Sequence, residues 1–94
     1  GKTEYYGVQA KAGNLSGSAT SNIREIVNQI VTGFDVPYKL VSGEEIYVSK
    51  MIIAISGNFT DNAQTIIQNS IDRYKFTNTI FLSKKELENH QVMI

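Results

Sequence analysis

A glutamine and a lysine two residues apart, Gln9 and Lys11, are the side chains of this sequence best suited to do chemistry. In an extended strand, residues two apart project from the same face. An amide oxygen can ligate a metal ion or its bound water weakly, and a lysine ammonium can position a water or stabilise charge developing on a phosphate. The pair fits one half of a metal-dependent site that cleaves phosphodiesters. The alternative is a surface glutamine and lysine at the end of a strand.

A glycine-rich loop over residues 13–18 follows this pair and contains Asn14 and Ser16. Their polar groups could approach a phosphate of DNA, so we assign them as candidate DNA-binding residues. Glycine and serine are also ordinary turn residues, and a plain connecting loop is the alternative. The loop lacks the Gly-Lys-Ser/Thr sequence of a P-loop.

Residue patterning predicts the elements that position these side chains. An aromatic-rich strand is expected over residues 5–11. The apolar stripe over residues 22–31 has the spacing of an amphipathic helix. We expect Asn22 and Glu25 to form a capping box at its start, and Gly33 to end it.

The second half of the chain continues the alternation of strands and helices. We expect an irregular stretch over residues 35–50, a strand over residues 51–57 and a helix over residues 61–74. A second strand over residues 79–82 and a short closing helix over residues 83–90 should follow. We expect Asp61 with Gln64 to cap the first of these helices, and Ser83 with Glu86 to cap the second.

This alternation predicts an α/β fold, a small three-layer α/β/α arrangement with a mostly parallel sheet. The continuous apolar run at residues 51–55 suits a strand that is covered on both faces. Three strands leave exposed sheet edges, which proteins normally cover or extend. We therefore expect residues 1–94 to form a single domain that is an incomplete part of a larger protein.

Composition excludes several classes of site. The 94 residues contain no cysteine and a single histidine, His90, which excludes disulfide scaffolds, thiolate zinc sites and multi-histidine metal sites. No apolar run approaches about 18 residues, so we expect no membrane partner, and the absence of cysteine fits a cytoplasmic location. The net charge of zero counts modestly against DNA binding by this piece alone.

Three motifs in order resemble the C-terminal half of the catalytic domain of PD-(D/E)xK nucleases of the Mrr type. Tyr6–Gly13 resembles the family's Gln-x-Lys strand, and an amphipathic helix follows it. Ile52–Ala63 is similar to its strand-to-helix junction, a hydrophobic strand followed by Gly-x-Phe-Thr-x-x-Ala. Thr79–Ser83 with Glu86-Leu87 resembles its last strand and closing helix. The similarity spans most of the chain except residues 35–50.

The resemblance implies a restriction-endonuclease-like fold, dependence on Mg²⁺, DNA as the partner and hydrolysis of its phosphodiesters. It assigns the catalytic lysine to Lys11 and the metal-site acid to Gln9, a substitution that Mrr-type members tolerate. The family also requires an aspartate on the preceding strand. Glu4 is the only acidic residue before Gln9, so the metal-binding aspartate is missing and these residues alone should not cleave DNA. A homodimer is a possible partner state, because the sheet has exposed edges and many such nucleases are dimers.

Two other hypotheses stay open. The chain could be a non-catalytic module of the same fold that binds nucleic acid or protein, or an unrelated α/β domain with a coincidental Gln-Ala-Lys triplet. The nuclease hypothesis requires the strand at residues 51–56 to lie beside residues 5–11 and parallel to them.

Overall fold

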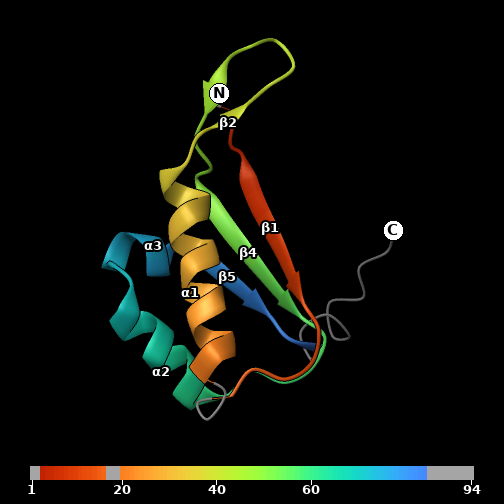
Figure 1. Ribbon diagram of the computed structural model, residues 1–94, viewed down its shortest axis with the longest axis vertical. Coiled ribbons are helices and arrows are strands. Elements are labelled where there is room, and N and C mark those ends of the chain that lie inside the picture. The colour runs from red at the N-terminus through yellow and green to blue at the C-terminus, as the bar shows by residue number, and fades with distance from the viewer. Residues whose placement is uncertain (1–2, 17–19, 85–94) are drawn as a thin grey trace.

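A parallel sheet of three strands forms the centre of the computed structural model, which describes residues 3–16 and 20–84 (Figure 1). The strands are β1 (Tyr6–Lys11), β4 (Lys50–Ile55) and β5 (Thr79–Leu82), and they lie in the order β1-β4-β5. β4 pairs in parallel with both neighbours, with Lys11 opposite Ile55. The condition that the nuclease hypothesis imposes is therefore met, although other α/β folds share this pairing.

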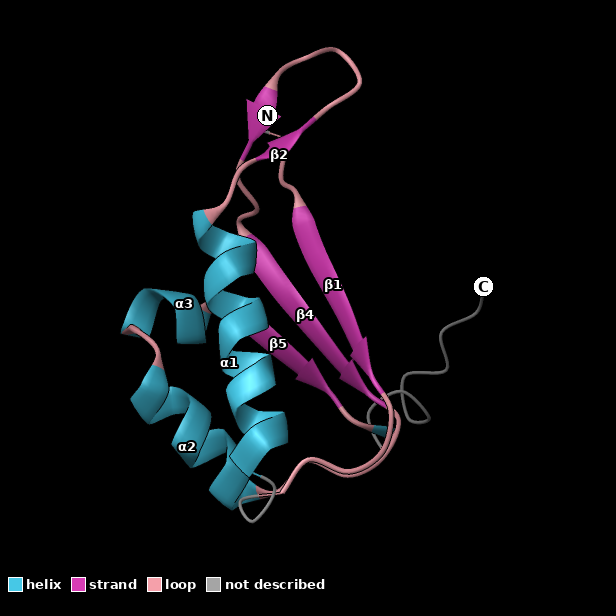
Figure 2. Ribbon diagram, viewed as in Figure 1, coloured by secondary structure: helices cyan, strands magenta, loops and turns pink. Residues whose placement is uncertain are grey.

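The three helices, α1 (Thr20–Asp35), α2 (Asp61–Ser70) and α3 (Arg73–Thr77), lie on one side of this sheet (Figures 1 and 2). Both crossovers advance in the same direction across the sheet, and right-handed crossovers of this kind place their helices on the same face. The α/β class and the parallel sheet are confirmed, but the described residues form two layers where three were expected. The part of the expected closing helix that follows Lys84 lies outside the described residues.

The helix-facing side of β4 supplies the centre of the hydrophobic core. Met51, Ile53 and Ile55 are at most 1% exposed and pack with apolar residues of α1 and α2. The alternate residues Ile52 and Ala54 are only partly buried and lie on the opposite face. The expectation that β4 is covered on both faces is therefore wrong for the described part of the chain.

Helix α1 is longer at both ends than its apolar stripe predicts. It begins at Thr20, so Asn22 lies inside the first turn and does not cap the helix. It also continues past Gly33 to Asp35 and ends where Pro37 restricts the preceding residue to extended conformations. Gly33 has a packing role instead, because a Cβ there would lie 2.6 Å from Sδ of Met51.

The predicted helix over residues 61–74 is two helices. Thr60, and not Asp61, caps α2, because its Oγ1 accepts a hydrogen bond of 3.2 Å from the Ala63 amide. Helix α2 stops at Ser70, and the Asp72 carboxylate then caps α3 by accepting from the Lys75 amide at 2.7 Å. A second capping residue thus restarts the helix after a break.

The stretch expected to be irregular contains a short antiparallel hairpin that extends beyond the sheet (Figure 1). Its strands are β2 (Tyr38–Lys39) and β3 (Glu45–Ile46), and its turn includes Gly43 at φ 92°. That conformation suits glycine because it has no Cβ. No helix among the described residues is long and apolar enough to cross a membrane.

Candidate functional site

Gln9 and Lys11 lie on strand β1, which has a neighbour on one side only within the described residues and so forms an edge of the sheet that they build. Both residues are partly buried and alternate with the exposed Val8 and Ala10. They pair in register with Ile53 and Ile55, whose side chains face the helices. The prediction that Gln9 and Lys11 share one face is therefore confirmed, and that face is the helix side.

Lys11 forms an ion pair with Glu25 of α1, at 2.7 Å between Nζ and Oε2. The Lys11 side chain is 21% exposed and that of Glu25 is 51% exposed, so water screens the pair and it stabilises the fold by at most about 1 kcal/mol. Its main consequence is geometric, since it holds the ammonium between β1 and α1. Sequence patterning assigned Glu25 a capping role only, and the spacing of these two residues carries no signal of their contact.

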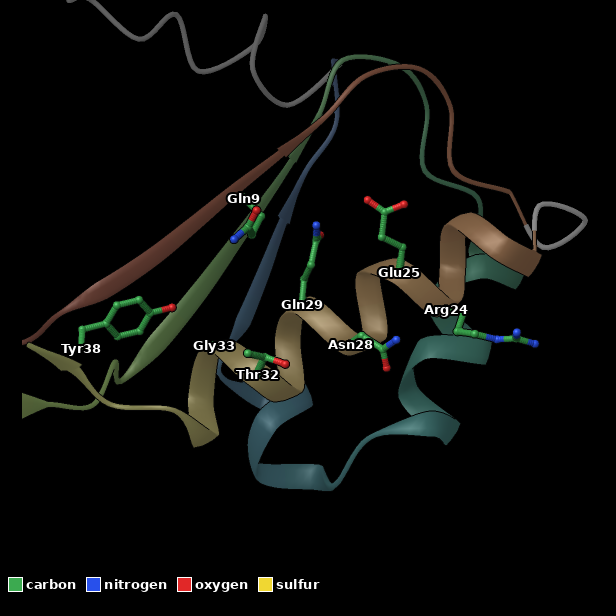
Figure 3. A pocket seen from close by; sticks show the side chains of 8 residues that line it. All are labelled: Gln9, Arg24, Glu25, Asn28, Gln29, Thr32, Gly33 and Tyr38. Atoms are coloured by element: carbon green, nitrogen blue, oxygen red, sulfur yellow. The ribbon is translucent and has the colours of Figure 1, made fainter.

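A pocket of about 460 Å³ opens between β1 and α1, beside this ion pair. Its walls come from β1, from α1 and from hairpin strand β2, and the residues that line it are Gln9, Arg24, Glu25, Asn28, Gln29, Thr32, Gly33 and Tyr38. Gln9 extends from β1 toward the helix, Gln29 and Glu25 extend from α1 toward the sheet, and the Tyr38 ring enters from the hairpin (Figure 3). Apart from Gln9, the sequence reasoning assigned none of these residues to a site.

The loop after β1 is tied to the loop after β4, and Asn14 makes one of the ties. Its Oδ1 accepts a hydrogen bond of 2.7 Å from the Asn58 amide. Next to it, Leu15 is fully buried and its backbone bridges to Phe59. Asn14 therefore connects the two loops, and its assignment to DNA binding stays a prediction. The partly buried Ser16 follows in the same loop and is not among the residues that line the pocket.

Few side chains of the usual metal-ligating types come together in the described part of the chain. No group of three or more histidine or acidic side chains within residues 3–16 and 20–84 could hold a metal ion. Mg²⁺ needs near-octahedral oxygen coordination and usually takes it from carboxylates, phosphates and water. Gln9 and Glu25 offer at most two such side chains, and Glu25 is already bound to Lys11.

A second charged cluster joins α1 to α3, with Lys75 Nζ 2.9 Å from Asp72 and 3.2 Å from Asp35. The Lys75 backbone amide and then the Lys75 side chain donate to Asp72 and hold the pKa of that carboxyl below its usual 3.8. Hydrogen bonds to Asp72 and then to Asp35 raise the pKa of Lys75 above 10.5. Capping of α3 and docking of the helices account for this cluster, which contributes no residue to the pocket.

The chain matches no protein-family model, no curated protein and no solved structure. The resemblance to Mrr-type nucleases therefore rests on the three sequence motifs.

Proposed function

We propose that this chain is part of a metal-dependent DNA endonuclease of the restriction-endonuclease-like type, with Gln9 and Lys11 as the Gln-x-Lys half of its active site. One observation carries the proposal. Both side chains project from an edge strand toward α1, where Gln9 lines a pocket and Lys11 is held by Glu25. A strand placed in this way can combine its side chains with those of a further strand added at the free edge.

Lys11 is the group that acts on the phosphate in this proposal. Its ammonium has three hydrogen-bond donors, and Glu25 engages one of them at 2.7 Å. The remaining donors can stabilise negative charge on a phosphate oxygen or orient a water molecule. Glu25 thus acts as a positioning residue for Lys11, since its carboxylate fixes the ammonium.

The metal-binding part of such a site must come largely from elsewhere. The described residues bring together no group of three or more histidine or acidic side chains, so we derive no metal-dependent step from them. The resemblance places the missing aspartate on a strand before β1, and the free edge of β1 is where that strand would pair. DNA as substrate, a second copy as partner and a cytoplasmic location belong to the same proposal.

Cleavage of supercoiled plasmid by the full-length protein, with and without Mg²⁺ or Mn²⁺, tests the proposal. Removal of a group that stabilises transition-state charge lowers a rate by about 10²–10³-fold, so Lys11→Ala should abolish nicking. Lys50→Ala is the matched control because Lys50 is also a partly buried strand lysine but pairs in register with Tyr6 on the opposite face. Circular dichroism checks that each variant folds. Absence of metal-dependent nicking, or nicking retained by Lys11→Ala, contradicts the proposal.

A non-catalytic module of the same fold, which binds nucleic acid or protein, is the second candidate. The ion pair that engages Lys11 favours it, as does the absence of any group of three or more histidine or acidic side chains within the described ranges. A folded protein that binds DNA with a steep dependence on salt but does not nick it would support this candidate.

A further inference from the structure

The pocket between β1 and α1 contains amide groups whose hydrogen-bonding capacity the fold leaves unused. Among the described residues, no hydrogen bond involves the side chain of Gln9 or Gln29. Both side chains extend into the same space from opposite walls (Figure 3). Each amide has a carbonyl acceptor and an NH₂ donor. A ligand that presents both donors and acceptors along one edge would satisfy the two together.

The charges around the pocket select against an anion. Glu25 lines the wall between Lys11 and Gln29, and it uses one carboxylate oxygen in the ion pair with Lys11. Its other oxygen has no hydrogen bond or ion pair among the described residues and remains an acceptor. Arg24 also lines the pocket, but its guanidinium extends away from the space between Gln9 and Gln29 (Figure 3). A neutral ligand with an N–H donor therefore fits better than a phosphate.

The third wall is aromatic. Tyr38 lies on hairpin strand β2, is 45% exposed and turns its ring into the space that Gln9 also lines (Figure 3). An exposed aromatic ring beside hydrogen-bonding groups is the usual surface on which unpaired bases stack. A volume of about 460 Å³ is also within the range of small-molecule sites.

We infer that this pocket binds an unpaired nucleobase whose exocyclic amino group lies beside a ring-nitrogen acceptor, adenine or cytosine. Glutamine pairs well with adenine through its amino group and ring nitrogen, and a carboxylate accepts from the amino group of cytosine. Gln9 and Gln29 bind the edge of the base, Glu25 accepts from its amino group, and Tyr38 stacks on its face.

This inference deepens the proposed function. That the bound base belongs to a DNA strand beside Lys11 rests on the proposed function. Binding of single nucleosides, measured without metal and without cleavage, separates the two. A protein that binds nucleosides but does not nick DNA would refute only the nuclease proposal. A protein that nicks DNA, but whose Gln9 and Gln29 NH₂ signals do not shift when nucleosides are added, would refute only the base pocket.

The test is a nuclear magnetic resonance titration of the ¹⁵N-labelled protein with deoxyadenosine, deoxycytidine and thymidine, which lacks the amino group. We expect deoxyadenosine or deoxycytidine to shift the side-chain NH₂ signals of Gln9 and Gln29, and thymidine to bind at least about threefold more weakly, as the loss of one hydrogen bond predicts. Gln29→Ala and Tyr38→Ala should each weaken binding by about 3- to 10-fold. Gln68→Ala, an exposed helical glutamine on α2, should leave it unchanged.

Three results would overturn the inference. The first is that no nucleoside shifts either amide signal. The second is that thymidine binds as well as deoxyadenosine and deoxycytidine. The third is that Gln29→Ala and Gln68→Ala behave alike. Gln29 is only partly buried and makes no hydrogen bond among the described residues, so its replacement by alanine should leave the fold intact, and circular dichroism checks this.

Discussion

Replacement of Gly33 by alanine tests how closely α1 packs on the sheet. The added Cβ would lie 2.6 Å from Sδ and 2.8 Å from Cε of Met51, both shorter than any ordinary contact. Overpacking of this kind destabilises by about 1–3 kcal/mol. Alanine also favours the helix over glycine by about 1 kcal/mol. We expect a net loss of stability of about 0–2 kcal/mol, which by itself does not separate the two effects.

A double-mutant cycle with Met51→Ala separates them. Met51 is 1% exposed, so its truncation should destabilise by about 2–5 kcal/mol. In that background the Cβ at position 33 enters the space left by the thioether, and only the gain in helix propensity remains. Gly33→Ala should then stabilise by about 1 kcal/mol. The coupling energy between the two substitutions should be about 1–3 kcal/mol, which is the overpacking term itself.

Urea denaturation followed by far-ultraviolet circular dichroism measures the four unfolding free energies, provided that the m-value stays constant. Gly43→Ala is the control. Gly43 has a φ of 92° with no atom near its missing Cβ, so its replacement should destabilise equally with and without Met51. Additivity of Gly33→Ala and Met51→Ala within about 0.5 kcal/mol would refute the close contact between α1 and β4.

Two further predictions concern the second half of the chain. The pKa of Asp72 is lowered in the folded state, so its contribution to stability is complete above pH 3.8 and is lost as the pH falls through the folded pKa. The stability difference between the protein and Asp72→Asn, which keeps the cap but cannot titrate, should therefore shrink in acid, and an unchanged difference would contradict this assignment. Thr60→Ala should cost about 1 kcal/mol in thermal or urea unfolding, because the Ala63 amide loses its acceptor. Thr65→Ala, whose hydroxyl bonds only to a helix carbonyl on the surface, should change stability much less, and equal effects would exclude Thr60 as the cap.

The sequence by itself determined the class of fold and the shared face of the two candidate residues. Alternation along a strand has a period of two, and this local rule is enough to place Gln9 and Lys11 together. The apolar stripe of α1 and the short apolar runs of β4 and β5 were equally predictable, because each depends on residues close in the chain. Boundaries were less predictable, since Thr60 and not Asp61 caps α2 and a second cap at Asp72 restarts the helix.

Only the tertiary structure decided what surrounds Gln9 and Lys11. The order β1-β4-β5 places all helices of the described residues on one face, whereas an order with β1 in the middle would have split them between two faces. Strand order depends on which edges pair, and no local period encodes it. The same packing brings Glu25 to Lys11, ties Asn14 to Asn58 across 44 residues of sequence, and makes Gly33 a contact for Met51. These contacts join separate elements, so they exist only once the crossovers have set each helix against the sheet.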